Sequence, residues 1–183
     1  MIGWRILGIW SVLVILSLAW LISDLNSKNS HIHSLMRWVW ILTVAYSGPL
    51  GLLIYHYSGR SQIKEDNIYR RAFRSVSHCY SGCGAGEITG ILIATGLALG
   101  QVWLVFLSFT LAFIAGYLMT AGPLIQEGVP IAVALKDALY SETASIAVME
   151  IVAISVDVLL AGQSTFSEPI FWISMVVSLS IGL

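Results

Sequence analysis

The chain has 183 residues, of which 57% are hydrophobic and 10% are charged, and its net charge is −1 at pH 7. Soluble domains carry roughly 25% charged residues, so this composition excludes an ordinary soluble globular domain and indicates an integral membrane protein. No basic patch interleaved with aromatic residues occurs in the sequence, and we therefore expect no nucleic-acid partner.

Six apolar segments follow one another along the sequence, and the sixth has 14 residues. A helix needs about 20 apolar residues to cross the hydrocarbon core, and the first five segments have that length. We predict an all-α, polytopic transmembrane helical bundle that forms one domain over residues 1–183. Either the sixth helix ends inside the membrane or the chain lacks its natural C-terminus. The segments are Ile2–Ser23, Leu35–Tyr57, Cys79–Gly100, Val102–Ala121, Ala138–Ala161 and Ile170–Leu183.

Basic residues predict the orientation of the bundle. Lys and Arg accumulate in cytoplasmic loops, and five of them lie in Ser58–Ser77, between the second and third segments. If every segment crosses the membrane, the N-terminus with Arg5 is also cytoplasmic, and Lys28 and Arg37 lie outside. We also expect short amphipathic helices around Ile68–Val76 and within Pro123–Asp137.

The second segment carries two special features. Trp38 and Trp40 lie near its start, where tryptophan commonly anchors a helix at the membrane interface. Gly48 and Pro49 lie inside the segment, and proline removes a backbone donor and kinks a helix. We therefore expect a kinked span.

Four acidic residues lie in stretches that should be buried in the bilayer: Glu87, Glu142, Glu150 and Asp157. An acid at the bilayer centre costs about 2.5–3.5 kcal/mol on insertion scales, so such residues usually face the protein interior and serve a function.

At 100° per residue, three of these acids and Met149 fall on one side of the fifth segment, and the acids span ~22 Å along its axis. We predict that the four acids form a path for a cation or a proton. The alternatives are that Glu142 only caps a helix and that Glu150 and Asp157 are protonated and hydrogen-bonded.

Two cysteines occur one helical turn apart and one turn before Glu87, so Cys79, Cys83 and Glu87 share a helix face, with His78 about a quarter-turn away. Soft thiolates favour Cu(I) or Zn, and carboxylate and imidazole widen the choice to Fe or Mn. We predict a transition-metal site, with copper as the first choice and zinc or iron after it. The alternative is that both thiols only pack. The predicted ligands are His78, Cys79, Cys83, Glu87, Glu142, Met149 and Glu150.

Gly82, Gly86 and Gly90 form a row of small residues on an adjoining face of the third segment. Such rows let two helix backbones approach closely in lipid. We expect the fifth segment to pack along this row, beside Glu87.

The order of several motifs resembles an uncharacterised bacterial membrane family, domain of unknown function 4396. The similarity extends from about Leu35 to the end of the chain, and its motifs are Met36–Trp40, Tyr46–Leu50, His78–Glu87, Glu142–Glu150 and Phe171–Trp172. The resemblance implies a bacterial cytoplasmic membrane. It also implies a further stretch after the sixth segment that this chain lacks, and an aspartate where the chain has Glu142. Copper-related labels on some members point towards copper, but the family has no settled activity.

These observations favour membrane transport or handling of a cation, most simply a transition metal such as copper, at a site between the third and fifth segments. One alternative is a membrane metalloenzyme with redox chemistry at the same residues, and another is a structural or assembly subunit. The expected partners are the lipid bilayer and a metal ion or proton, and a homo-oligomer is compatible with the sequence.

Overall fold

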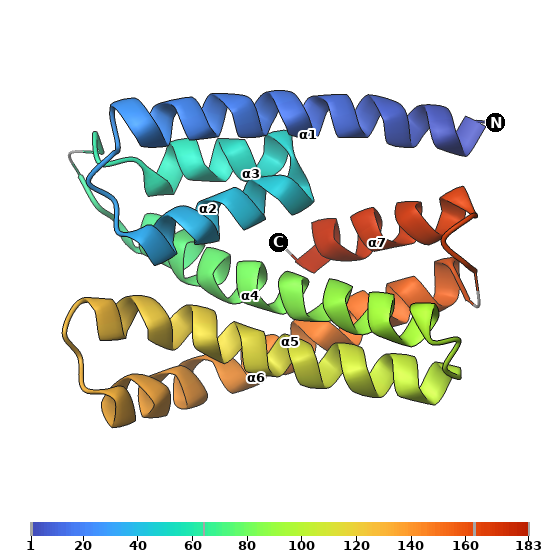
Figure 1. Ribbon diagram of the computed structural model, residues 1–183. Coiled ribbons are helices and arrows are strands. Elements are labelled where there is room, and N and C mark those ends of the chain that lie inside the picture. The colour runs from blue at the N-terminus through green and yellow to red at the C-terminus, as the bar shows by residue number, and fades with distance from the viewer. Residues whose placement is uncertain (1, 64, 163, 183) are drawn as a thin grey trace.

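The computed structural model describes residues 2–63, 65–162 and 164–182, and over these residues the protein is a bundle of helices (Figure 1). The predicted all-α class is confirmed for this part of the chain. The elements in order are α1 (Ile2–Ser27), α2 (Ser34–Ser47), α3 (Pro49–Ile54), the π-helical turn η1 (Tyr55–Gly59), α4 (Ile68–Gly96), α5 (Gln101–Gln126), α6 (Ile131–Leu160) and α7 (Pro169–Gly182).

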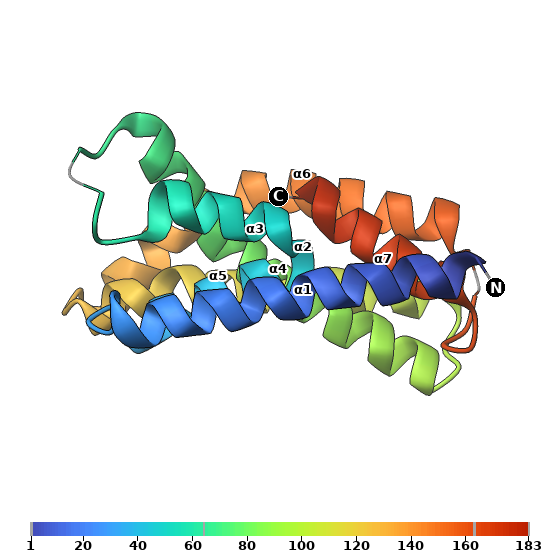
Figure 2. The ribbon, with the colours of Figure 1, turned by 90° about the horizontal axis from the view of Figure 1, so that it is seen from above.

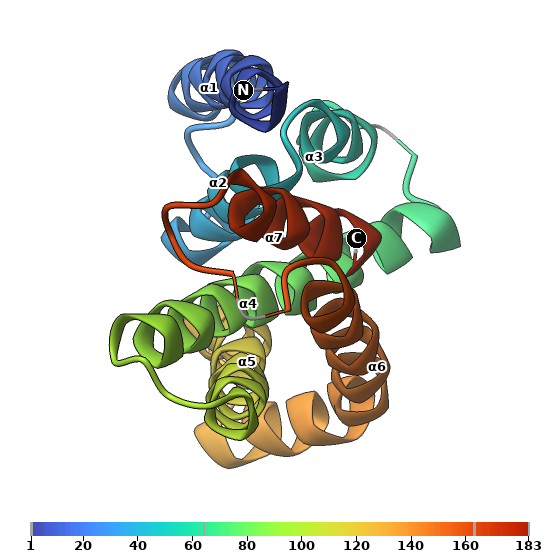
Figure 3. The same ribbon diagram turned by 90° about the vertical axis from the view of Figure 1, so that its right-hand side faces the viewer.

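Among the described residues, three helices, α1, α5 and α6, are long and apolar enough to cross a membrane. These helices are compatible with a membrane protein. Helix α4 has 29 residues, but a large part of its surface is glycine, serine and cysteine and is buried against other helices. It occupies the centre of the bundle, between the α1–α3 part and the α5–α6 pair (Figure 3).

Helices α4 and α6 begin well before the segments predicted from hydropathy. Helix α4 joins the expected amphipathic helix around Ile68–Val76 to the third segment. It starts after Asn67, whose side-chain oxygen accepts a hydrogen bond of 2.9 Å from the backbone N–H of Arg70. Helix α6 likewise begins directly after Pro130 and continues without a break through the fifth segment.

The second apolar segment is not one kinked span. It forms a hairpin in which α2 ends at Ser47 and α3 and η1 run back towards the end where α2 began (Figure 1). The reversal occurs at Gly48, whose φ of 55° and ψ of −125° suit glycine, and at Pro49, which has no N–H to continue the α2 ladder.

Side-chain contacts join the two ends of this hairpin. The Asn29 side-chain oxygen, which lies before α2, accepts hydrogen bonds from the Ser61 hydroxyl at 2.7 Å and the Ser61 N–H at 3.0 Å. Asp24 on α1 forms an ion pair with Arg60 at 3.0 Å and accepts a hydrogen bond from the Tyr55 hydroxyl at 2.8 Å. The loop before α2 and the loop after η1 therefore lie at the same end of the bundle.

This hairpin changes the expected topology. Gly3 lies against Pro169 and Ile173 at the start of α7, so the N-terminus is at the other end of the bundle from the loop after η1 (Figure 2). The sequence prediction placed the N-terminus and Ser58–Ser77 on the same side. The structure places them at opposite ends, because residues 34–59 enter the bundle and return instead of crossing it.

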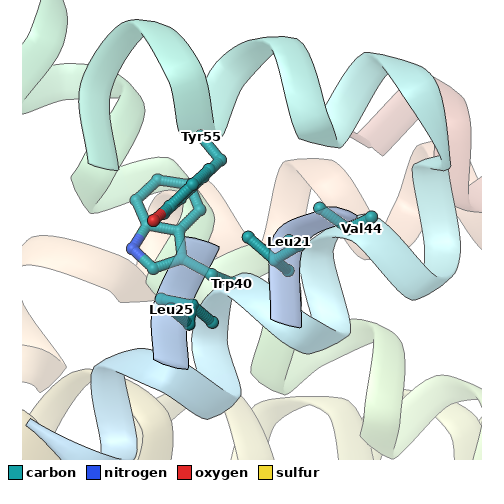
Figure 4. Packing of buried hydrophobic residues seen from close by; sticks show 5 residues of the cluster. All are labelled: Leu21, Leu25, Trp40, Val44 and Tyr55. Atoms are coloured by element: carbon teal, nitrogen blue, oxygen red, sulfur yellow. The ribbon is translucent and has the colours of Figure 1, made fainter. Parts of the chain in front are cut away.

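The hairpin packs on α1 through a core of five buried residues (Figure 4). Trp40 is fully buried in this core, whereas the sequence suggested an interface anchor. Its ring meets that of Tyr55 edge-on, with centroids 5.3 Å apart, an arrangement worth about 0.5–1.5 kcal/mol. The five residues are Leu21, Leu25, Trp40, Val44 and Tyr55.

The glycine row of α4 packs closely on a neighbouring helix, as expected, but the neighbour is α5 and not α6. A Cβ added at Gly82, Gly86 or Gly90 would come within 3.0 Å of α5 backbone atoms. The expected pairing with the fifth segment is therefore wrong. A row of small residues indicates close approach but carries no information about which helix approaches.

Replacing Gly86 by alanine should destabilise the bundle. The added methyl group would meet the α5 backbone at Leu111 and Ala112, which cannot rotate away, and overpacking of this kind costs about 1–3 kcal/mol. Thermal unfolding in detergent is the measurement.

Gly96→Ala in the same helix is the matched control, because nothing lies within 4 Å of its added Cβ. The control should be neutral or stabilising by about 0.4–1 kcal/mol. Equal melting temperatures for the two variants would contradict the packing of α4 on α5.

Candidate site of buried acids between helices α4 and α6

The buried side of α6 carries three acids in one stripe. Glu142, Glu150 and Asp157 are 6%, 1% and 7% exposed, and they alternate with buried alanine and isoleucine at helical spacing. The prediction that these acids share one side of the helix is confirmed.

Glu87 on α4 is 2% exposed, so it also faces the protein interior. Its electrostatic neighbours are Glu150 and then Asp157. Helices α4 and α6 run in the same direction from the end that holds the loops after η1 and α5 (Figure 1). The structure thus brings Glu87 together with Glu150, about two thirds of the way along both helices. We call Glu142, Glu150, Glu87 and Asp157 the acid series.

Several oxygens of the acid series have no partner. Within the described part of the chain, one carboxyl oxygen of Glu87, one of Glu150 and both of Asp157 are buried without a hydrogen bond. A buried polar group left unpaired costs about 1–3 kcal/mol, so each such group in a folded protein needs an explanation.

Asp157 is the clearest example of an unpaired buried carboxyl group. It faces the hydroxyl groups of Ser174 and Ser178 on α7. Both hydroxyls donate instead to carbonyls of their own helix, at 2.9 Å to Phe171 and 3.1 Å to Met175. The carboxyl group is therefore close to two polar side chains without being satisfied by either.

The two thiols of α4 lie alongside the acids of α6. Cys79 and Cys83 are free and buried, and their sulfur atoms are 3.7 Å apart. Cys83 lies beside the carboxyl group of Glu150, and Cys79 lies beside that of Glu142. Buried polar side chains consequently follow one another along most of α6.

A small cavity adjoins the acid series at the end of the bundle that holds the α4–α5 and α6–α7 loops. Its volume is about 30 Å³, and Asp157, Gln101, Ser164 and Ser174 are among its lining residues. That volume accommodates a water molecule. A more open depression of about 320 Å³ shares Gln101 and Ser164 with it and reaches the loop surface.

The seven predicted metal ligands do not converge. His78 faces α5, with its Nδ1 3.4 Å from the Met119 carbonyl oxygen, because it lies about 100° around α4 from Cys79. Within residues 2–63, 65–162 and 164–182, no three His, Cys, Asp or Glu side chains are arranged to hold a metal ion.

The sequence interpretation missed two polar features. The Tyr80 hydroxyl is buried next to Ser47 at the tip of the hairpin and has no hydrogen bond among the described residues. Ser174 and Ser178 on α7 face Asp157. The signal for these serines was a polar pair at i, i+4 in an apolar helix, which places both on one face.

A family model described as "Domain of unknown function (DUF4396)" matches residues 68–183. No curated protein and no solved structure matches the chain. The match begins at the first residue of α4 and includes the whole acid series. It starts later than the resemblance from Leu35 suggested, so α1 and the hairpin lie outside it. Because the match covers more than half of the chain, this protein belongs to the DUF4396 family.

Proposed function

We propose that this protein transports a cation across the membrane along the acid series. The observation that carries the proposal is the set of unpaired, buried carboxyl oxygens on Glu87, Glu150 and Asp157. Ionisable residues inside a membrane are expensive, and those that face a bundle interior commonly mark ion or proton pathways.

The geometry of the series suits stepwise movement. Glu142 and Asp157 are fifteen residues apart on α6, which is ~22 Å of a hydrocarbon core of about 30 Å. Each carboxyl group offers an oxygen ligand for a cation or an acceptor for a proton. The cavity next to Asp157 supplies water access at one end.

A purely structural role accounts for these acids less well. Polar residues that hold membrane helices together do so by hydrogen-bonding across the interface, and each such bond contributes about 0.6 kcal/mol. The unpaired oxygens of Glu87, Glu150 and Asp157 make no such bond within the described chain. Their burial costs free energy that helix association does not return.

We also propose that α1, α4, α5 and α6 cross the membrane, and that the end with the loops after α1, η1 and α5 is cytoplasmic. Seven of the described basic residues belong to that end, and Arg5 belongs to the other, which agrees with the positive-inside rule. The N-terminus is then outside. The seven are Lys28, Arg37, Arg60, Arg70, Arg71, Arg74 and Lys136.

Glu87→Gln and Glu150→Gln should each abolish cation or proton flux in proteoliposomes while the protein stays folded. Glutamine keeps the shape of the side chain and removes both the charge and the exchangeable proton. Melting temperatures should change little, because the unpaired oxygens of Glu87 and Glu150 make no hydrogen bond in the described chain that the substitution would remove.

The matched control is Glu65→Gln, which makes the same chemical change at an exposed loop position and should leave flux unchanged. Fully active Glu87 and Glu150 variants would show that the acids only bridge helices.

Single added cysteines test the orientation. A membrane-impermeant maleimide applied to intact cells should label Ser167→Cys, in the exposed α6–α7 loop, and should not label Glu65→Cys, in the exposed loop before α4. The native thiols are buried and give a low background. Labelling of Glu65→Cys from outside would reverse the assignment.

A further inference from the structure

Three sulfur-containing side chains belong to one packed cluster beside the acid series. The thiols of Cys79 and Cys83 lie on one face of α4 with their sulfur atoms 3.7 Å apart, and neither is in a disulfide. Met149 of α6 packs against the cluster that contains both thiols, next to Ile146 and Ala112. We call Cys79, Cys83 and Met149 the sulfur cluster.

The separation of the thiols suits a shared ion. Metal–thiolate bonds are about 2.3 Å long, so one ion bound to sulfur atoms 3.7 Å apart would have an S–M–S angle of ~107°. That angle needs no movement of α4 and is close to the tetrahedral value of about 109°. A thioether from the facing helix would supply a third ligand.

The residue types select the class of ion. Thiolate and thioether are soft ligands that favour Cu(I) and comparable closed-shell ions, whereas carboxylate and carbonyl oxygens suit Mg²⁺ and Ca²⁺. His78 faces α5 and is not available to widen the choice. The proposed site contains a methionine. It therefore differs from a group of three His, Cys, Asp or Glu side chains, which the described part of the chain does not hold.

The surroundings provide for the thiol protons. Binding of one monovalent ion by two thiols gives a bis-thiolate complex and releases two protons, with no change of oxidation state. Cys79 lies beside Glu142, and Cys83 lies beside Glu150, so each thiol has a carboxyl group next to it that can take up and pass on a proton.

The cluster also has open space on one side. A groove of about 580 Å³ between α4, α6 and α7 is lined by Cys79, Ser145 and Met149 among other residues. Space for an ion to approach therefore lies next to Cys79 and Met149.

We propose that Cys79, Cys83 and Met149 bind one soft monovalent cation of the Cu(I)/Ag(I) class, and that this ion is the cargo of the acid series. The second half of this statement rests on the proposed transport function, and the first half does not.

The test is a titration of the purified, reduced, full-length protein in detergent with Ag⁺, followed by gel filtration and metal analysis. One Ag⁺ per chain should remain bound. Cys79→Ser or Cys83→Ser should weaken binding about 100-fold, and Met149→Leu about tenfold, comparable to the loss of a supporting group at a metal site. Met119→Leu, which removes a thioether outside the cluster, is the control and should bind like the wild type.

X-ray absorption of the Cu(I)-loaded wild-type protein keeps the proposal testable if the cysteine variants unfold. Sulfur neighbours alone should surround the metal, and oxygen or nitrogen neighbours in their place would overturn the site. Unchanged Ag⁺ binding in a folded Cys79→Ser, Cys83→Ser double variant would overturn it as well.

Flux assays test the sulfur site and the cargo assignment separately. Ag⁺ binding by the wild type without Ag⁺ flux in proteoliposomes would overturn the cargo assignment and leave the site intact. Absence of Ag⁺ binding, together with proton flux that Glu87→Gln abolishes, would overturn the sulfur site and leave the proposed function intact.

Discussion

The burial of the polar surface of α4 is the constraint on which the rest of the bundle depends. This helix carries Glu87, two thiols and several glycines and serines, and lipid offers such a surface no hydrogen-bonding partner. The bundle buries most of it: the glycine row admits the α5 backbone, and α6 turns its own acidic stripe towards the thiols and Glu87. Acids from two helices are consequently confined together in the interior of the bundle.

The hairpin of α2 and α3 helps to bury α4 on its opposite side. Its tip brings Tyr46 and Ser47 next to Tyr80, and its two ends are held by the contacts of Asp24 and Asn29 with residues 55–61. Non-helical backbone at membrane depth is tolerated only where protein or water surrounds it, and in transport proteins interrupted helices often lie near the substrate site. At this reversal Ser47 lies next to Tyr80 of α4, the helix whose Glu87 we assign to transport.

Local periodicity explains what was predictable from the sequence. The 100° rotation per residue was enough to place Glu142, Glu150 and Asp157 on one side of α6, and the cost of burying acids in lipid was enough to predict that Glu87 faces inwards. Gly48 and Pro49 predicted a kink in the second segment, where the structure has a complete break. The extent of that break was not predictable, because the positive φ at Gly48 and the pairing of Asn29 with Ser61 depend on contacts between residues about thirty positions apart. The same reversal puts the N-terminus and Ser58–Ser77 at opposite ends of the bundle, because a segment that returns does not carry the chain to the other end.

The second feature that the sequence could not predict was which neighbour each face of α4 contacts. Gly82, Gly86 and Gly90 predicted a close helix contact, yet nothing in the row distinguishes α5 from α6. His78 is adjacent to Cys79 in the sequence and was therefore grouped with the thiols, but one residue is a rotation of about 100° and turns it towards Met119. Residues that are adjacent in the sequence point in different directions around a helix, so His78 and Cys79 face different neighbours.

Infrared difference spectroscopy of the wild-type protein in lipid tests the central claim most directly, because it observes the carboxyl groups themselves. Spectra recorded before and after addition of a transported cation should show changes in carboxyl bands, and part of the change should vanish in Glu87→Gln and part in Glu150→Gln. Carboxyl bands that respond to no cation and to no change of pH would show that the buried acids are inert and would contradict the account.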